Sequence, residues 1–239
     1  MKILSVSDFE DKRLEHLIER KSRKLKGIDY IFSCGDLPKR YLEYLTIALK
    51  KKLFFVVGNH CVADFYAKAF LSRVKTQRVR NGLWRRHNAG GTDLHAHAER
   101  IDDYIVVGFG GTMKYNPGPF QFSEKQMSKL VKRTIKSVRL KHLADFFLFR
   151  KRKEVIVVSH APVAEIHDRN DRCHNGFKCF RHFIRKTKPL MWIHGHIHPE
   201  GAENIRQAEY KGTLIVNTVP SKVIEIKNGR VCIEDKFYL

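Results

Sequence analysis

The stretch KLFFVVGNH, residues 52–60, sets the architecture of the first half of the chain. Five consecutive apolar residues, Leu53 to Val57, are followed directly by a glycine and two polar residues. Two earlier segments have the same form: KILSVS (2–7) ends before an aspartate, and IDYIFSCGD (28–36) ends on one. Apolar runs of this length without alternation are typical of strands that are covered on both faces, as in parallel sheets.

Segments with helical spacing separate these three strands. The apolar residues that define them are Leu14, Leu17, Ile18 and Leu25 in the first segment, and Leu42, Leu45 and Leu49 in the second. Pro38 suits the first turn of the second helix, because its fixed backbone angle and missing N–H are tolerated there. Residues 2–60 therefore predict a β-α-β-α-β unit with a parallel sheet.

The second half repeats this pattern and adds a hairpin. Further strands are predicted at 103–111, 154–162 and 190–198, with helices at 124–143 and 177–187 between them. The tail alternates and turns at Asn228-Gly229, which predicts a hairpin near a sheet edge. No linker divides the chain, so we expect one domain over residues 1–239, with the polar stretch 76–91 as a surface loop.

The composition limits the location and the partners. The chain has 46 Lys and Arg residues against 25 Asp and Glu residues, and the formal charge of +21 attracts polyanions and anionic substrates. The excess recurs along the whole chain, so solubility or cellular chemistry is the alternative explanation. Five cysteines without CxxC spacing indicate reduced thiols. No apolar run could span a bilayer and no signal peptide is visible, so we expect a cytoplasmic protein without a membrane partner.

Polar residues that can bind metal follow five of the predicted strands. They are Asp8, Asp36, Asn59 with His60, His160, and the series His194, His196 and His198. Loops at the carboxyl ends of parallel strands gather over one place in open α/β sheets, which predicts a single site. Two carboxylates, an amide and several imidazoles form the mixed oxygen and nitrogen set that two divalent ions need.

Each of these residues also has a purely structural interpretation. Asp8 or Asp36 alone would more simply cap the helix that follows it, and Asn59 suits a tight turn after Gly58. His194 lies within an apolar strand and could be a core histidine. In MWIHGHIHPE (191–200) the alternate histidines would lie roughly 6.6 Å apart on one face of an extended chain, so they could converge on a metal.

The ordered motifs SDF, GD, GNH, SHAP and GHIH resemble those of the calcineurin-like metallophosphoesterases, in particular the small stand-alone bacterial and archaeal phosphoesterases. The resemblance implies an α/β fold, a four-layer α/β/β/α sandwich with two mixed β-sheets, and a dinuclear metal centre. By motif, Asp8 and His198 would hold one ion and Asp36 would bridge. The second ion would be held by Asn59, His160 and His196.

The resemblance also implies roles for residues around the metals. His60 would contact the scissile phosphate or protonate the leaving oxygen, so His60 and Asp36 are the expected catalytic residues. Asp171 and His174 lie in a loop that resembles a substrate-binding element of the family, although surface turn residues are an equal alternative.

Two positions depart from the family pattern. The usual Asp-x-His motif is here Asp8-Phe9-Glu10, so Glu10 either replaces the histidine as an oxygen ligand or is a first-turn helix carboxylate. Cys61 stands where the family often has an acidic residue that orients the GNH histidine. An oxygen ligand at Glu10 would favour a harder ion such as Mn²⁺, with iron, zinc, nickel and magnesium as alternatives.

We therefore predict a metal-dependent hydrolase of phosphate esters that prefers a small phosphodiester to a monoester. One alternative is a nuclease acting on DNA or RNA. Another is a binding module for nucleic acid or protein on a phosphoesterase scaffold that has lost catalysis. The positive charge favours nucleic acid as a partner, but fold alone does not choose a substrate.

Overall fold

The computed structural model describes residues 1–60, 62–65, 91–198 and 206–234. The predicted surface loop at 76–91 and the departure at Cys61 lie outside these residues, apart from Gly91, which begins β4. No helix in the described ranges is long and apolar enough to cross a bilayer.

The predicted β-α-β-α-β unit is confirmed. Its elements are β1 (Lys2–Val6), α1 (Lys12–Glu19), β2 (Tyr30–Ser33), α2 (Lys39–Leu49) and β3 (Lys52–Phe55). The three strands are parallel, and β4 (Gly91–Asp93) extends them. The first helix is shorter than its apolar spacing predicts. It ends at Glu19 and Lys21 turns left-handed, so Leu25 is buried from a separate 3-10 turn, Arg23–Leu25.

The first sheet is completed from the far end of the chain. Its order is β14-β13-β1-β2-β3-β4, where β13 (Ser221–Lys227) is antiparallel to both β1 and β14 (Arg230–Ile233). The predicted hairpin at Asn228-Gly229 is confirmed, because both residues have positive φ between these two strands and β14 forms the sheet edge.

The second sheet has the order β11-β12-β10-β9-β6-β5. Its strands are β5 (Ala98–Ile101), β6 (Tyr104–Phe109), β9 (Glu154–Ser159), β10 (Met191–His194), β11 (Gln207–Tyr210) and β12 (Thr213–Asn217). The central four are parallel, and β5 and β11 are antiparallel edges. The remaining described elements are α3 (Val62–Phe65), the short pair β7 (Thr112–Met113) and β8 (Gln121–Phe122), α5 (Glu124–Phe147) and α6 (Lys178–Thr187).

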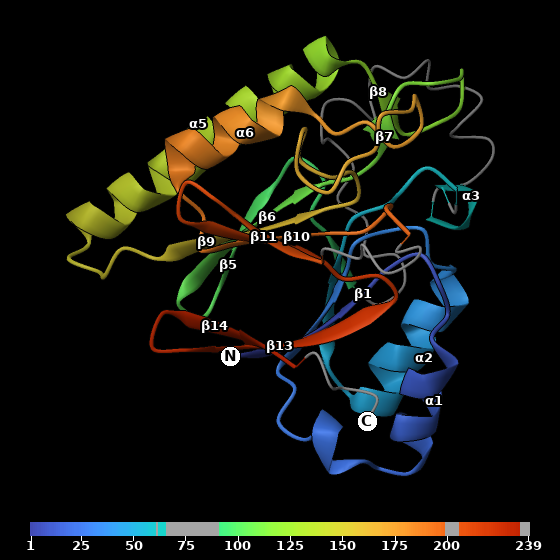
Figure 1. The fold of residues 1–239 in the computed structure, drawn as a ribbon. Helices are drawn as coiled ribbons and strands as arrows, with labels where there is room; N and C mark the ends of the chain where they lie inside the picture. Colours follow the sequence, from blue (N-terminus) through green and yellow to red (C-terminus); the bar gives the residue numbers. More distant parts are fainter. Residues whose placement is uncertain (61, 66–90, 199–205, 235–239) are drawn as a thin grey trace.

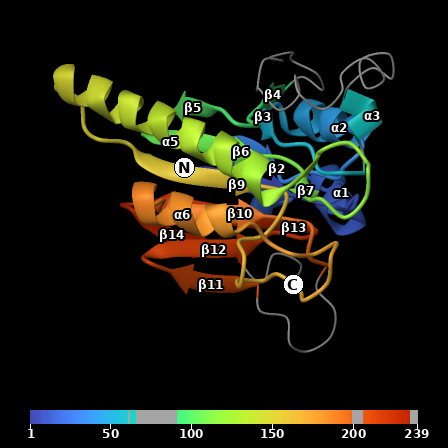
Figure 2. The ribbon, with the colours of Figure 1, turned by 90° about the horizontal axis from the view of Figure 1, so that it is seen from above.

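The helices and sheets form the predicted four layers (Figure 1). α5 and α6 cover the outer face of the second sheet, and α1 and α2 cover the outer face of the first. Alternate strand residues explain this stacking. Phe32 and Ile193 face the space between the sheets, whereas their neighbours Ile31 and Trp192 face the helices. Figure 2 shows α5 and α6 lying side by side over the sheet.

Local sequence explains the longest helix. Ser123 begins α5 with a capping box, because its hydroxyl accepts from the Gln126 N–H while the Gln126 side chain accepts from the Ser123 N–H. Met127, Val131 and Ile135 are buried on one face, as predicted from their spacing. The parallel strands of both sheets direct their carboxyl ends toward the same side of the molecule, where the polar residues predicted from the sequence gather.

Candidate metal centre

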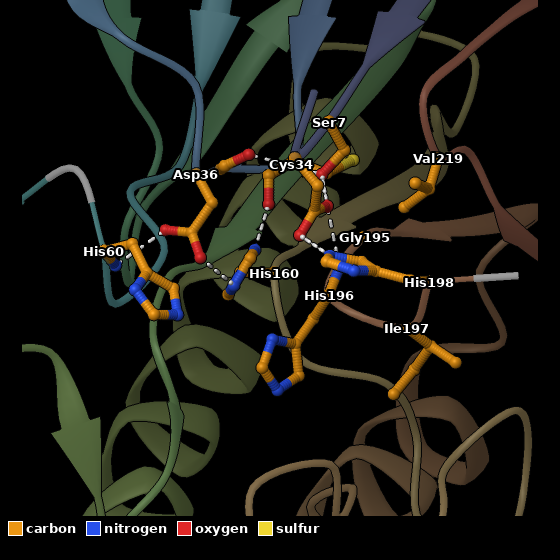
Figure 3. Close-up of polar contacts among 12 residues, drawn as sticks. Ser7, Cys34, Asp36, His60, His160, Gly195, His196, Ile197, His198 and Val219 are labelled. Carbon is orange, nitrogen blue, oxygen red and sulfur yellow. Dashed lines mark hydrogen bonds and ion pairs between the residues drawn. The ribbon is translucent and has the colours of Figure 1, made fainter. Parts of the chain in front are cut away.

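Four of the predicted residues converge at the carboxyl ends of the strands. One ligand-type atom from each of Asp8, Asp36, His160 and His196 lies within 4.8 Å of those of the others. The residues come from segments that follow β1, β2, β9 and β10, so both sheets contribute. Figure 3 shows the His160 ring beside the Asp36 carboxylate, with His196 next to it.

The backbone at this site is held in an uncommon conformation. Asp8, Asp36 and His196 have φ values of 67°, 53° and 65°, in the left-handed region that non-glycine residues rarely adopt. Such residues persist where surrounding structure imposes them, and they are common at functional sites. Neither aspartate is a helix cap. The cap of α1 is Asp11 and that of α2 is Pro38, so the simpler capping interpretation of each aspartate was wrong.

Two glycines leave room for this arrangement. A Cβ added to Gly58 would overlap the carboxylate of Asp36, and one added to Gly195 would overlap the Ser7 hydroxyl. A side chain at either position would therefore displace a carboxylate or its hydrogen-bond partner. The backbone approaches the cluster this closely only because both positions lack a Cβ.

His160 is oriented by the backbone of the other sheet. Its Nδ1 donates to the Cys34 carbonyl at 2.8 Å, which leaves Nε2 facing Oδ2 of Asp36 at 3.2 Å. Nε2 is buried, and the Asp36 carboxylate is its ion-pair partner when the ring is protonated. Burial lowers the pKa of His160, but the nearby carboxylates of Asp36 and Asp8 outweigh burial and raise it to about 9. The protonated ring therefore places a positive charge where the carboxylates favour a cation.

The surroundings of Asp36 and Asp8 favour the charged form of both carboxylates. Burial raises the pKa of Asp36, but the positive charge of His160 outweighs burial and holds this pKa below its usual value, with help from the His60 N–H that donates to Oδ1 at 2.8 Å. Burial likewise raises the pKa of Asp8, but hydrogen bonds from His198 and Ser7 and the charge of His160 lower it overall. Both groups are therefore anionic at neutral pH.

His196 and Asn59 each use one side-chain atom in a hydrogen bond and keep an acceptor atom for another partner. The Nε2 of His196 donates to the Cys173 carbonyl at 2.8 Å, so Nδ1 carries the lone pair. Burial and the charge of His160 lower the pKa of His196 to about 4, which keeps the ring neutral. The Asn59 amide donates to the Tyr115 hydroxyl at 3.0 Å, while its buried Oδ1 has no partner.

These donors fit divalent metal ions. Oδ1 of Asn59 is buried without a hydrogen-bond partner, and in the four-residue cluster Nε2 of His160 meets only the Asp36 carboxylate. Buried polar atoms without partners are costly in a folded protein, and a metal ion would satisfy these. The hydrogen bonds from His160 and His196 to carbonyls are the kind of outer contact that orients metal-binding histidines.

His194 and His198, the first and last histidines of the series, lie in different environments. The extended chain of β10 ends at His194, and the left-handed turn at His196 breaks the alternation expected for 191–198. His194 is a core histidine, as its structural interpretation predicts. It contacts His167 at 2.9 Å, and burial lowers its pKa to about 3. His198 lies at the rim with its Nε2 3.3 Å from Oδ1 of Asp8.

Glu10 is not part of the four-residue cluster. Its carboxylate pairs with Arg40 at 3.0 Å, although the residue still borders the cavity beside the cluster. The cavity is about 400 Å³ and is lined by Asp8, Phe9, Glu10, Asp36, Pro38, His60, His174, His196 and His198. His60 is exposed there, as expected for a residue that meets substrate.

The loop at 171–174 contributes one side chain to the cavity. His174 lies against His196, with 5.2 Å between ring centres, whereas Asp171 does not line the cavity. Asp171 instead holds His174 through a 2.8 Å contact with Nδ1. Hydrogen bonding from His174 lowers the pKa of Asp171.

Sequence reasoning missed three residues at this site. Tyr115 orients Asn59, Ser7 donates to Asp8 at 2.5 Å, and Phe9 packs on the His198 ring. Ser7 and Phe9 flank a predicted ligand in the motif SDF, which was a usable signal. Tyr115 lies 56 residues from Asn59, so only tertiary structure could pair them.

Comparison with known proteins identifies the class. A sequence model of the calcineurin-like phosphoesterases matches residues 1–200, so the chain belongs to that family. A search of curated protein sequences gave no match. Membership places the chain among phosphate-ester hydrolases that use divalent metal ions.

Two solved structures agree on the fold. One covers 98% of both chains at 15% identity, with a TM-score of 0.61. The crystal structure of TT1561 from Thermus thermophilus covers 98% of this chain and 97% of its own, at 15% identity and a TM-score of 0.55. A lower TM-score of 0.43 is found for an archaeal phosphodiesterase, which covers 98% of this chain and 99% of its own at 12% identity.

Proposed function

We propose that this chain hydrolyses a small phosphodiester with water activated at a dinuclear divalent metal centre. The observation that carries the proposal is the convergence of Asp8, Asp36, His160 and His196, whose ligand-type atoms all lie within 4.8 Å of one another. In the described part of the chain, no other group of His, Cys, Asp and Glu side chains brings its ligand-type atoms this close together.

The donors divide into two sets that share one carboxylate. Asn59, His160 and His196 would hold one ion together with Asp36, and Asp8 with His198 would hold the other. When bound, such ions lower the pKa of water and stabilise charge on phosphoryl oxygens. Mn²⁺ is the first choice for this mixed donor set, and iron, zinc, nickel and magnesium are the alternatives.

His60 is the proposed general acid. Its backbone N–H is anchored on Asp36 while its exposed side chain borders the cavity, so it can reach a leaving oxygen. Proton donation of this kind contributes ~10²- to 10⁴-fold in rate. His174 is placed to donate to a phosphoryl oxygen, and Asp171 would act by holding it.

The cavity wall supports a diester over a monoester. Phe9 and Pro38 provide apolar surface beside the polar centre, and Phe9 is about half exposed at 47%. A diester has a second organic group that this surface can bind. It also brings one negative charge fewer than a monoester dianion toward Asp8 and Asp36.

The role of Glu10 stays a prediction. To bind metal, its carboxylate would have to leave Arg40, which is exposed and held only at the surface. A surface ion pair of this kind contributes little stability, about 0–1 kcal/mol, so the exchange costs little.

The test is metal add-back to chelator-treated protein. Each candidate ion is added alone, and hydrolysis of bis(p-nitrophenyl) phosphate is compared with that of p-nitrophenyl phosphate. Asp36→Ala and His160→Ala should lose turnover by at least roughly 100-fold while staying folded. The matched controls are Asp103→Ala, an exposed carboxylate at 97%, and His182→Ala on α6. Full activity in both site variants would overturn the proposal.

The charge of +21 favours a second candidate, a nuclease or a non-catalytic nucleic-acid binding module. Binding to DNA or RNA that falls steeply with salt and persists in Asp36→Ala would support the module, because counterion release depends on basic residues rather than on metals. Cleavage of the same strands that is lost in Asp36→Ala would support the nuclease.

A further inference from the structure

The C-terminal end of α5 carries an apolar surface that the metal centre does not explain. Nine large hydrophobic residues are exposed in the described part of the chain, and six of them fall within ten consecutive positions. These six, which we call the α5 tip, are Leu140, Leu143, Phe146, Phe147, Leu148 and Phe149. Scattered exposed apolar residues are normal, but a contiguous group marks an interaction surface.

The tip is rigidly built. The Leu148 N–H donates to the Ala144 carbonyl and the Arg150 N–H to the Asp145 carbonyl, both within 3.0 Å, so the chain leaves the helix through ordered bonds. Asp145 is fully buried and its carboxylate pairs with Arg100 of β5 at 2.7 Å. The exposure of the tip is therefore a property of the fold and not of a frayed helix end.

Phe149 is the most unusual residue of the tip. Its φ of 51° is left-handed, at a helix end where glycine is the usual residue, and its side chain is 99% exposed. A phenylalanine at this position is strained and loses the benefit of burial within the chain. The cost of exposure is offset if another apolar phase receives the ring.

The charge around the tip is strongly positive. Residues 136–153 contain seven Lys or Arg residues against one Asp, a formal charge of +6, and that Asp is the buried partner of Arg100. A hollow beside the tip is lined by Arg139, His142, Leu143, Phe146, Arg150 and Arg152. Among the described residues, none of these three arginines has a carboxylate partner. Guanidinium groups over an apolar floor suit a phosphate that is attached to a hydrocarbon chain.

The tip projects away from the rest of the molecule. In both views α5 continues past the end of α6, and its last turn lies at the opposite end of the second sheet from the loops of the metal centre (Figures 1 and 2). Strand order agrees, because β9 begins at Glu154 beside the tip and delivers His160 to the centre at its other end. The helix of 24 residues is about 36 Å long at 1.5 Å per residue.

We infer that the α5 tip docks on the surface of an anionic phospholipid bilayer. Phe147, Phe149 and the exposed leucines enter the boundary between headgroups and acyl chains, and the surrounding cations bind lipid phosphates. The sequence expectation of no membrane partner rested on the absence of a spanning segment, which surface docking does not need. The metal centre then faces away from the bilayer, toward soluble substrates.

Charge complementarity favours this occupant over others. A second copy of the chain would bring a second cluster of +6 against the first. A nucleic acid would match the charge and could stack on the phenylalanines, but bases gain little from the three leucines that form half of the tip. Aliphatic and aromatic side chains ringed by cations are the pattern of interfacial helices.

The experiment is co-sedimentation of the full chain with vesicles. Vesicles of phosphatidylcholine with increasing phosphatidylglycerol should bind the protein progressively, and pure phosphatidylcholine should bind it weakly. Phe147→Ser/Phe149→Ser should weaken binding at least about tenfold. Arg150→Gln/Arg152→Gln should weaken it roughly fivefold per charge removed.

Two variants serve as matched controls. Ile47→Ser removes another exposed apolar residue, and Lys125→Gln/Lys129→Gln removes two charges from the opposite end of the same helix. Both should bind vesicles like the unmodified chain, and thermal melting checks the fold of every variant. As a positive signal, the fluorescence of Phe149→Trp should shift to the blue when phosphatidylglycerol vesicles are added.

Three results would overturn the inference. The first is binding to anionic vesicles that is absent, or that is equally strong in Phe147→Ser/Phe149→Ser. The second is a dimer in solution that this double variant converts to a monomer, because a second copy would then cover the tip. The third is single-stranded RNA that binds through the same two residues while vesicles do not.

Discussion

The stabilisation that His160 gives the metal-free protein should be lost as the pH rises from about 6.5 to 9. The cause is His160, whose pKa is about 9 in the folded chain, against 6.5 for an ordinary histidine. Burial alone would lower this pKa, but the carboxylates of Asp36 and Asp8 reverse the effect. A raised histidine pKa stabilises the folded state fully below pH 6.5, and the stabilisation is lost as the pH rises through the folded value.

The magnitude follows from the shift. A difference of about 2.5 pKa units corresponds to about 3 kcal/mol of unfolding free energy. His160 is fully buried, so solvent screens little of this interaction. Burial lowers the pKa of His95 and of His196 to about 4 and that of His194 to about 3, so these rings are neutral in the folded chain. They bind protons near pH 6 only when the chain unfolds, which opposes the effect of His160 at the acid end of the window and makes a comparison with a His160 variant necessary. Hydrogen bonding to a carboxylate raises the pKa of the half-buried His198, which adds to the fall in the same direction.

The assay is urea unfolding of chelator-treated protein at pH 6, 7.5 and 9. The difference in unfolding free energy between the unmodified chain and His160→Gln should shrink by about 3 kcal/mol from pH 6 to pH 9, whereas the difference from His182→Gln should change little. Metal affinity should change in the opposite direction and rise with pH, because the ion competes with the proton on Nε2. A stability difference between the unmodified chain and His160→Gln that does not change with pH would refute the assigned charge state of His160.

Three further substitutions test the organisation of the site. Asn59→Leu should weaken metal binding by at least roughly tenfold in calorimetry, while loss of its hydrogen bond to Tyr115 lowers the stability of the metal-free protein by only about 1 kcal/mol, since Oδ1 has no partner to lose. Tyr115→Phe should lower metal affinity about tenfold through loss of its contact with Asn59, whereas Tyr44→Phe on α2 should not; equal affinities would show that Tyr115 does not orient the amide. Arg40→Ala should strengthen binding of a second equivalent of Mn²⁺ in native mass spectrometry if the released Glu10 is a ligand, and unchanged stoichiometry would leave Glu10 as a helix carboxylate.

The helices and strands and their order could be predicted from residue spacing and type. The apolar runs of residues 2–60 predicted three parallel strands, and the spacing of Met127, Val131 and Ile135 predicted the buried face of α5. Asn228-Gly229 marked the hairpin. These features rest on interactions between residues that are close along the chain, so spacing and residue type are sufficient to predict them. The motif order also predicted that Asp8, Asp36, His160 and His196 would meet at the strand ends.

The contacts and roles of the polar residues could be seen only in the tertiary structure. Asp8 and Asp36 look like helix caps in sequence, but left-handed backbone directs their carboxylates toward each other from two different strand ends. Glu10 pairs with Arg40, which lies 30 residues away in sequence. His194 is a core residue and His196 belongs to the metal cluster, because the extended chain ends between them. The physical reason is the same in each case, because the direction of a side chain depends on contacts across the sheets that local spacing does not encode.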